Sequence, residues 1–344
     1  MLKLSSSQTL VDPPPASTST TIGTTKTAKL EDDLEKVLKR HGFPWKSSIV
    51  DTDTSAHQSE PFYQPFFEWQ LTYMKKNLHN LQLKPTMDRS ETQDLTYIDN
   101  LERIKDGKTK RKPHRMMTIC FTCDEYRLIR MTLLDGGGAV QVFTSLWYPN
   151  GHVNMPVLGI DLLQFSNATR HLTVVDFQPI QSSEQDHDLP YEHLLEPIRN
   201  RYPSLQHTMS RRFYDESDGF FSKQMLLGKG QSTEYVFSEL WPAYQDYVQT
   251  HTYLVKKCLK NDISNNNKDV ATVDVERENY HRRDSSVTAA AAPVGLQGQK
   301  RYDDYSSVRD PAHGLLVSCF GKTYADDFVY DVLFPLCTRD EKGT

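Results

Sequence analysis

The sequence predicts an α+β fold, in which a central antiparallel sheet is covered by helices. Three observations support this. Residues 30–83 carry apolar residues at helical spacing, residues 117–180 form β-branched and aromatic segments joined by short connections, and most of the remaining chain returns to helical spacing. Short connections between successive strands favour antiparallel pairing. A block of strands followed by a block of helices is typical of α+β proteins.

Two helices are expected before the strands. The first begins near Leu30, shows an apolar face and ends at Gly42. The second covers residues 64–83, and its apolar side chains share one side: Phe67, Leu71, Met74, Leu78 and Leu81.

Five strands and a second group of helices follow. The strands are expected at 117–123, 126–134, 139–148, 156–165 and 171–180. Three consecutive glycines at 136–138 mark a turn, and SNATR (166–170) forms a five-residue turn between the last two strands. Helical spacing then returns at 192–202, at 236–258 and in the region after Asp310.

The chain is expected to form a single domain over residues 29–337, followed by a short tail at 338–344. Residues 1–28 are rich in Ser, Thr and Pro, hold one acid and are expected to be disordered. Their composition resembles a plastid transit peptide but lacks arginine, so a plain tail and a transit peptide remain alternatives. Residues 259–300 are polar and without period, which predicts a disordered insertion.

Composition excludes several classes of protein. A net charge of -5 gives no general case for a nucleic-acid partner, and no apolar run has transmembrane length, so a soluble protein is expected. Five cysteines are an odd, scattered set that does not form a disulfide framework. Cys120 and Cys123 form a CxxC pair, but on a strand such positions face opposite sides, which disfavours a zinc or redox site.

An acid stands in the middle of the apolar stretch MPVLGIDLLQF, residues 155–165. Asp161 shares one strand face with Gly159 and Leu163, and both faces of this strand are largely apolar, which indicates burial on both sides. Gly159 leaves room for close approach to the backbone. The next strand repeats the theme with Asp176. Each acid is either a buried carboxylate satisfied by amides or an arginine, or a proton donor kept near neutral by desolvation.

Three stretches together resemble the ferredoxin-dependent bilin reductase family. They are MPVLGIDLLQF with the following LTVVDFQPI, then RRFYDESDGFFSKQMLLGK (211–229), then RDPAHGLLVSCFGKTYADDFVYDVLFP (309–335). The resemblance covers residues 140–337 less the insertion, with the helical region before them. It implies a three-layer α/β/α sandwich with a tetrapyrrole pocket between the sheet and the C-terminal helices. It also implies reduction of biliverdin or a dihydrobiliverdin, with no bound metal or flavin.

The resemblance assigns proton donation to two acids, while single electrons come from reduced ferredoxin. Asp161 matches the catalytic Asp of the sheet, and Asp310 matches the one on the helical side. Each electron added to a conjugated ring system raises its basicity, so a positioned acid lowers the barrier. Asp310 also precedes Pro311 and an apolar run, so a helix-capping role is its structural alternative.

Thr144 narrows the expected product. Members of the family that make phycocyanobilin carry a histidine seventeen residues before the sheet Asp, where this chain has Thr144. The FYDES and FFSKQML segments look closest to the branch that converts 15,16-dihydrobiliverdin to phycoerythrobilin. The alternatives are phytochromobilin synthesis, reduction of biliverdin to 15,16-dihydrobiliverdin, and a bilin carrier without catalysis.

Further residues are candidates for substrate contact. Thr144 and Gly159 are expected to border the bilin, and its propionates need basic partners, for which Arg211, Arg212 and Lys223 are candidates, with plain surface charge as the alternative. An aromatic stripe on the helix at 236–258 would stack beside the bilin or simply pack in the core; it consists of Tyr244, Tyr247, His251 and Tyr253.

Residues 103–115 carry seven basic residues against one acid. This run is a solvated loop, a nuclear-localisation or nucleic-acid segment, or a docking patch for the strongly acidic ferredoxin. The last interpretation centres on Lys108, Lys110, Arg111 and Lys112. The expected partners are ferredoxin, the bilin and a neighbouring bilin reductase or bilin lyase, with no nucleic acid and no membrane. The expected location is the chloroplast stroma.

Overall fold

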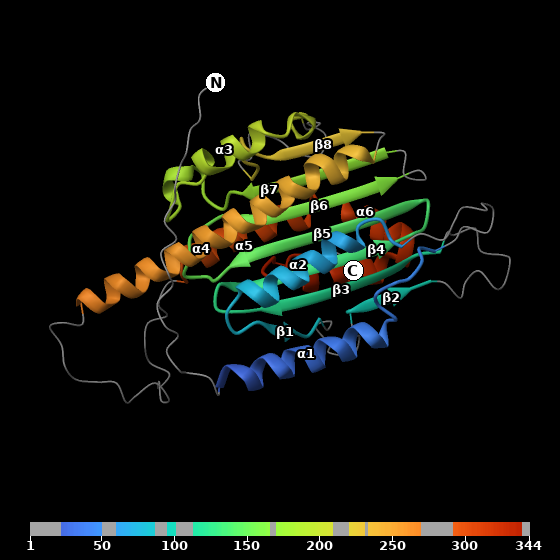
Figure 1. Cartoon of the computed structure of the whole chain (residues 1–344), viewed down its shortest axis with the longest axis horizontal. Helices are drawn as coiled ribbons and strands as arrows, with labels where there is room; N and C mark the ends of the chain where they lie inside the picture. Colours follow the sequence, from blue (N-terminus) through green and yellow to red (C-terminus); the bar gives the residue numbers. More distant parts are fainter. Residues whose placement is uncertain are drawn as a thin grey trace, which may run out of the picture.

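The computed structural model (Figure 1) describes residues 22–49, 60–86, 95–100, 113–165, 170–208, 220–230, 233–269 and 292–338. Its strands are β1 (Gln82–Lys84), β2 (Tyr97–Asp99), β3 (Arg115–Thr122), β4 (Tyr126–Asp135), β5 (Val140–Pro149), β6 (Val157–Phe165), β7 (Arg170–Gln178) and β8 (Leu226–Gly230). Its α-helices are α1 (Ile22–Arg40), α2 (Gln64–Asn77), α3 (Glu192–Asn200), α4 (Trp241–Asp269), α5 (Val294–Ser307), α6 (Ala312–Phe320) and α7 (Lys322–Asp327). Two π-helical turns, Val236–Leu240 and Phe328–Leu333, precede α4 and follow α7. Among the described helices, none combines the length and apolar character needed to cross a membrane.

The eight strands form one antiparallel sheet. Strands β3 to β7 lie side by side in chain order, β8 pairs with β7, and both β1 and β2 pair with β3. Each of the five long strands is β-branched or aromatic-rich, and each connection within this group is short, so neighbours in sequence become neighbours in the sheet. The predicted antiparallel sheet is confirmed.

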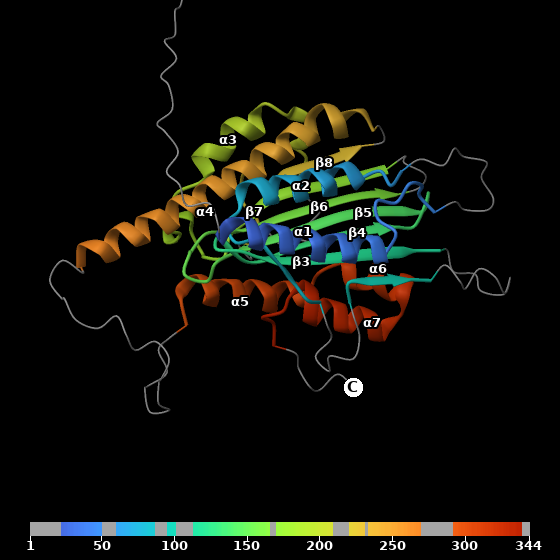
Figure 2. The same ribbon diagram turned by 60° about the horizontal axis from the view of Figure 1, so that its bottom comes forward.

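Helices cover both faces of the sheet and make three layers. Figure 2 shows α1 to α4 on one side and α5, α6 and α7 on the other. We call these the closed face and the open face of the sheet, because only the second borders the cavity described below. The layers confirm the α/β/α sandwich.

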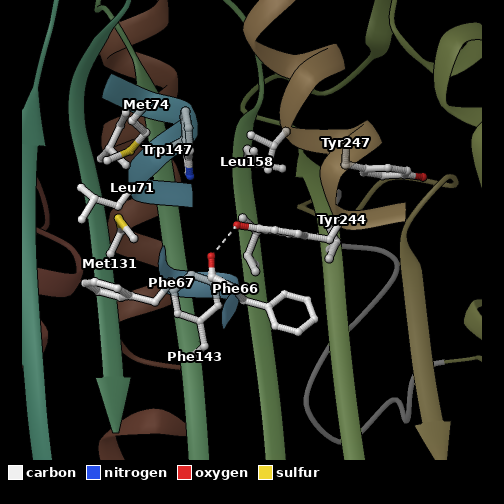
Figure 3. Packing of buried hydrophobic residues seen from close by; sticks show 14 of the residues in the cluster. Phe66, Phe67, Leu71, Met74, Met131, Phe143, Trp147, Leu158, Tyr244 and Tyr247 are labelled. Atoms are coloured by element: carbon white, nitrogen blue, oxygen red, sulfur yellow. Dashed lines mark hydrogen bonds between the residues drawn. The ribbon is translucent and has the colours of Figure 1, made fainter. Parts of the chain in front are cut away.

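Aromatic side chains fill the closed face (Figure 3). Helices α2 and α4 pack there on fully buried residues of the sheet, including Phe143 and Trp147. The hydroxyl of Tyr244 donates to the backbone oxygen of Phe66 at 3.3 Å and to Oε1 of Gln70 at 3.1 Å, so this buried hydroxyl is satisfied. Tyr244, Tyr247 and His251 are fully buried, which confirms packing for these three, whereas Tyr253 is 57% exposed and lies outside the core.

His251 ties α4 to the beginning of β6. The hydroxyl of Tyr126 donates to its Nδ1 at 2.9 Å, and its Nε2 donates to the backbone oxygen of Pro156 at 2.9 Å. Burial lowers the pKa of His251 to about 4, so the ring is neutral at physiological pH and fits this donor and acceptor pair.

Several boundaries differ from the sequence predictions. The second helix ends at Asn77 rather than 83, because Leu78 is extended and Asn80 has a φ of 53°, after which the chain enters β1. Helix α1 begins at Ile22, inside the expected tail, and α4 continues to Asp269, inside the expected insertion, because adding residues to a formed helix costs little. Residues 1–21 and 270–291 lie outside the described part.

Helix α5 is the largest element that the sequence missed, since its first turns were assigned to the insertion. A Cβ atom at Gly295 would lie 2.5 Å from the backbone oxygen of Val153, and one at Gly298 would lie 2.8 Å from that of Ile180. Glycines therefore let this helix approach closely the backbone of the β5–β6 connection and of the segment that follows β7. A packing face built from glycine gives no apolar periodicity, which explains why the pattern was missed.

Asp303 anchors α5 to the open face. Tyr148 donates its hydroxyl to Asp303 Oδ1 at 2.8 Å, and the Leu336 amide donates to Oδ2 at 2.9 Å. Burial raises the pKa of Asp303 to about 7, although Arg127 opposes that rise.

Asp303 should make stability depend on pH. Its pKa is higher in the folded protein than the ordinary 3.8, so its contribution is complete below pH 4 and is lost as pH rises through 7. For one carboxyl the slope is at most about 1.4 kcal/mol per pH unit. We expect Asp303→Asn to flatten the free energy of unfolding over this range, measured by urea denaturation. Parallel profiles for the two proteins would contradict the assignment, and the comparison cancels contributions from other carboxyls.

Candidate active site

A cavity of about 300 Å³ lies on the open face of the sheet. Strands β3 to β7 form its floor, and α6 with the turn Phe328–Leu333 forms its roof. A smaller hollow of about 40 Å³, bordered by α5 and by Phe220 and Phe221, adjoins it. The two share four lining residues: Arg130, Asp161, Asp310 and Pro311.

Strand β6 aims Asp161 into this cavity. Asp161 pairs with Thr144 of β5 and Val174 of β7, so it stands near the middle of the sheet. Leu158, Ile160 and Leu162 belong to the closed-face core, while Val157, Leu163 and Phe165 pack on the open face. The predicted division of this strand into two faces is confirmed.

The surroundings of Asp161 favour its protonated form. Burial raises the pKa of its carboxyl, whereas a hydrogen bond from Thr144 and the positive charge of Arg130 lower it; the net direction is upward. The structure therefore brings to the cavity an acid that holds its proton at higher pH than an exposed Asp does.

Asp310 reaches the same cavity from the helical layer. Its Oδ1 accepts the backbone N–H of Ala312, the first residue of α6, at 2.7 Å, but Pro311 rather than Asp310 takes the predicted N-cap position. Burial, together with the nearby charge of Asp161, raises the pKa of Asp310 to about 6. One side chain thus both satisfies an N–H at the start of α6 and lines the cavity.

Thr144 lies between Arg130 and Asp161. It lines the cavity, accepts a hydrogen bond from Nη2 of Arg130 at 3.3 Å and hydrogen-bonds to Asp161. One hydroxyl can accept and donate at once, so Thr144 links the guanidinium of Arg130 to the carboxyl of Asp161. The sequence prediction placed Thr144 at the substrate, and the structure places it on the cavity wall.

Arg130 is a cavity residue that the sequence reasoning missed. It lies on β4, is 3% exposed and faces both hollows. A charged residue between Ile129 and Met131 in an apolar strand is the same signal that singled out Asp161. Applied to every strand, that signal would have found Arg130.

Gly159 makes room for the side chain of Gln178. A Cβ atom there would lie 2.5 Å from Oε1 of Gln178, so the missing side chain makes room for Gln178. Gln178 lines the smaller hollow and accepts a hydrogen bond from the Tyr302 hydroxyl. Gly159 itself is not among the residues that line either hollow, so the structure does not bring it to the cavity wall.

Asp176 is a buried acid whose carboxyl is satisfied by hydrogen bonds within the protein. It is fully buried and accepts hydrogen bonds from the backbone N–H and the hydroxyl of Ser222. This fixes the segment that carries Phe220 and Phe221 against the smaller hollow. Burial raises the pKa of Asp176 to about 7.

Of the remaining predicted site residues, only Lys223 lies in the described part of the chain. Lys223 is exposed and borders neither hollow, because Ser222, its neighbour, is the residue that turns inward. Arg211 and Arg212 lie outside the described residues, as do Lys108, Lys110, Arg111 and Lys112.

The two thiols of the CxxC pair lie on opposite faces of the sheet. Cys120 packs on the open face and Cys123 on the closed face, as strand alternation predicts. Burial raises the pKa of each thiol to about 12, which suppresses the reactive thiolate. Across the described ranges, no group of three or more His, Cys, Asp or Glu side chains could hold a metal ion.

Known proteins agree with this architecture. A family model described as ferredoxin-dependent bilin reductase matches residues 79–335. The 15,16-dihydrobiliverdin:ferredoxin oxidoreductase of Nostoc punctiforme (strain ATCC 29133 / PCC 73102) is 30% identical over 272 residues, which are 79% of this chain and 94% of the relative. The protein of the same name from Gloeobacter violaceus (strain ATCC 29082 / PCC 7421) is 33% identical over 223 residues, 62% of this chain and 76% of the relative.

A solved structure shares the fold. It is the crystal structure of phytochromobilin synthase from tomato in complex with biliverdin, with a TM-score of 0.55 and 19% sequence identity. The match covers 80% of this chain and 83% of that chain. At this identity the likeness shows the fold alone.

Proposed function

Because the chain belongs to the ferredoxin-dependent bilin reductase family, we propose that it reduces 15,16-dihydrobiliverdin to phycoerythrobilin. The family makes it an oxidoreductase with reduced ferredoxin as its electron donor. The observation that carries the proposal is the meeting of Asp161 and Asp310 at one cavity, from opposite layers of the sandwich. The choice of substrate is supported by relatives named for 15,16-dihydrobiliverdin.

The proposed reaction adds two electrons and two protons to the bilin. Two reduced ferredoxins are oxidised, each giving one electron, and the substrate gains two hydrogens. Asp161 donates from the sheet side and Asp310 from the helical side, because both carboxyls have a raised pKa and both face the cavity. The apolar residues around them, such as Leu163 and Leu315, keep bulk water away from a radical intermediate.

An anaerobic assay with reduced ferredoxin tests this function. Biliverdin and 15,16-dihydrobiliverdin are offered separately, and products are identified by absorbance and chromatography. We expect turnover of 15,16-dihydrobiliverdin to phycoerythrobilin. Turnover of biliverdin alone would replace the proposal with a sister activity, and tight binding of both without turnover would indicate a bilin carrier.

The basic run at 103–115 is proposed as the ferredoxin docking patch, with Lys108, Lys110, Arg111 and Lys112 at its centre. Opposite charges accelerate encounter, and salt screens them. We expect kcat/KM for ferredoxin to fall about 10-fold or more between low and high salt. Bilin affinity, measured without ferredoxin, serves as the control. A flat salt profile for the ferredoxin-dependent rate would remove this assignment.

We also propose a plastid location, on the composition of residues 1–28. A fluorescent protein fused behind this segment should enter plastids of an algal or plant cell. Retention of the fusion in the cytosol would contradict a transit peptide.

A further inference from the structure

We propose that Arg130 binds the substrate, by donating hydrogen bonds from Nε and Nη1 to a lactam oxygen of the bilin. This inference rests on the proposed function, since it assumes that a linear tetrapyrrole occupies the cavity. It adds a cationic contact at the floor of the site, on a strand that carries neither of the two acids.

Arg130 has hydrogen-bond donors that no described protein group accepts. Its Nη2 donates to Oγ1 of Thr144 at 3.3 Å, while its buried Nε and Nη1 have no hydrogen-bond partner within the described part of the chain. A buried donor without a partner costs free energy, and more so when it is charged. Arg127 of the same strand also has a buried nitrogen without a partner, but only Arg130 borders the cavity, where a ligand oxygen can accept its hydrogen bonds.

Arg130 is also well placed to contact a ligand. It lies where the larger cavity meets the smaller hollow, together with Asp161 and Asp310. Thr132, two residues along β4, and Thr144 on β5 line the same wall. Apart from these polar groups, the floor is apolar, so a ligand oxygen placed here finds its strongest donor in Arg130.

A lactam oxygen suits this position better than a propionate does. Asp161 and Asp310 already face this space, and a propionate beside them would add repulsion between like charges whenever either acid is ionised. A neutral lactam oxygen accepts hydrogen bonds without adding a negative charge. Arg309, by contrast, is exposed, borders the smaller hollow and stacks 4.2 Å above the ring of Tyr305. It is the cation better placed for a propionate that reaches toward solvent.

The experiment is an absorbance titration of the full chain with 15,16-dihydrobiliverdin and with its dimethyl ester, without ferredoxin. We expect Arg130→Met to weaken binding of both ligands by about 10- to 100-fold. The ester lacks propionate charge, so an equal loss for both ligands identifies the lactam contact. A loss confined to the free acid would overturn it in favour of a propionate.

Two further variants test whether the loss of binding is specific to Arg130. Arg127→Met is the matched control, because Arg127 is a half-buried arginine of the same strand that stacks on Tyr148 and borders neither hollow. It should leave both affinities unchanged. Arg130→Lys keeps the charge but loses the planar set of donors, and it should also weaken binding about 10-fold, which covers the case that Arg130→Met fails to fold.

The outcomes distinguish this inference from the proposed function. Equal affinities of the unaltered protein and the Arg130 variants would overturn the inference alone. A failure of the unaltered protein to bind either ligand would overturn the proposed function, and the inference with it.

Discussion

Replacement of Asp161 by Asn should leave the bilin bound and stop its reduction. Asn is close to Asp in shape and can still accept the hydrogen bond from Thr144, so the cavity wall keeps its form. It has no acidic proton, and loss of general acid catalysis costs about 10²–10⁴-fold in rate. Single-turnover absorbance changes after mixing with reduced ferredoxin measure this loss, and a titration without ferredoxin measures binding.

Asp303→Asn is the matched control for that experiment. Asp303 is a buried acid on the same side of the sheet, with a raised pKa, but it anchors α5 and borders neither hollow. It should keep the unaltered turnover rate at a temperature where it is folded. An Asp161→Asn protein with normal turnover would return Asp161 to the purely structural role of Asp176.

The reduction rate should fall as pH rises through about 6, where Asp310 loses its proton. If the protonated carboxyl is the donor, the rate falls about tenfold per pH unit above that value. Asp310→Asn should lower the rate by about 10²-fold or more and remove this limb. Rates are measured at saturating ferredoxin, because salt and pH also act on its docking.

The two acids should titrate as a pair. The charge of Asp161 raises the pKa of Asp310, so in Asp161→Asn the pH limb of the residual activity should move to lower pH. If Asp310→Asn keeps both the rate and the fall in rate above pH 6, Asp310 has only a structural role at the start of α6.

Strand positions were predictable because period-two patterns state which residues share a face. The sequence placed Asp161 opposite Leu158, Ile160 and Leu162, and the two cores divide in that way. The order of the long strands also followed, since short connections leave few topologies. Only the resemblance to a family joined Asp161 to Asp310, because they are 149 positions apart and no local pattern relates them.

The differences between the predicted and observed positions have physical causes. A glycine in a strand shows that something approaches, but not what, and at Gly159 the side chain of Gln178 occupies the space. The charge of Lys223 and its position beside the FFSK motif made it a candidate. The segment is irregular, however, so its sequence does not show which side chains point inward: Ser222 is buried and Lys223 is exposed. The three-residue strands β1 and β2 are too short to show a period.

The contrast between the closed and open faces bears on how this protein can evolve. The aromatic core of α2 and α4 secures the sheet from one side, so stability does not depend wholly on the side chains that line the cavity. Substitutions on the wall with Thr144 can therefore reshape the cavity while the fold persists.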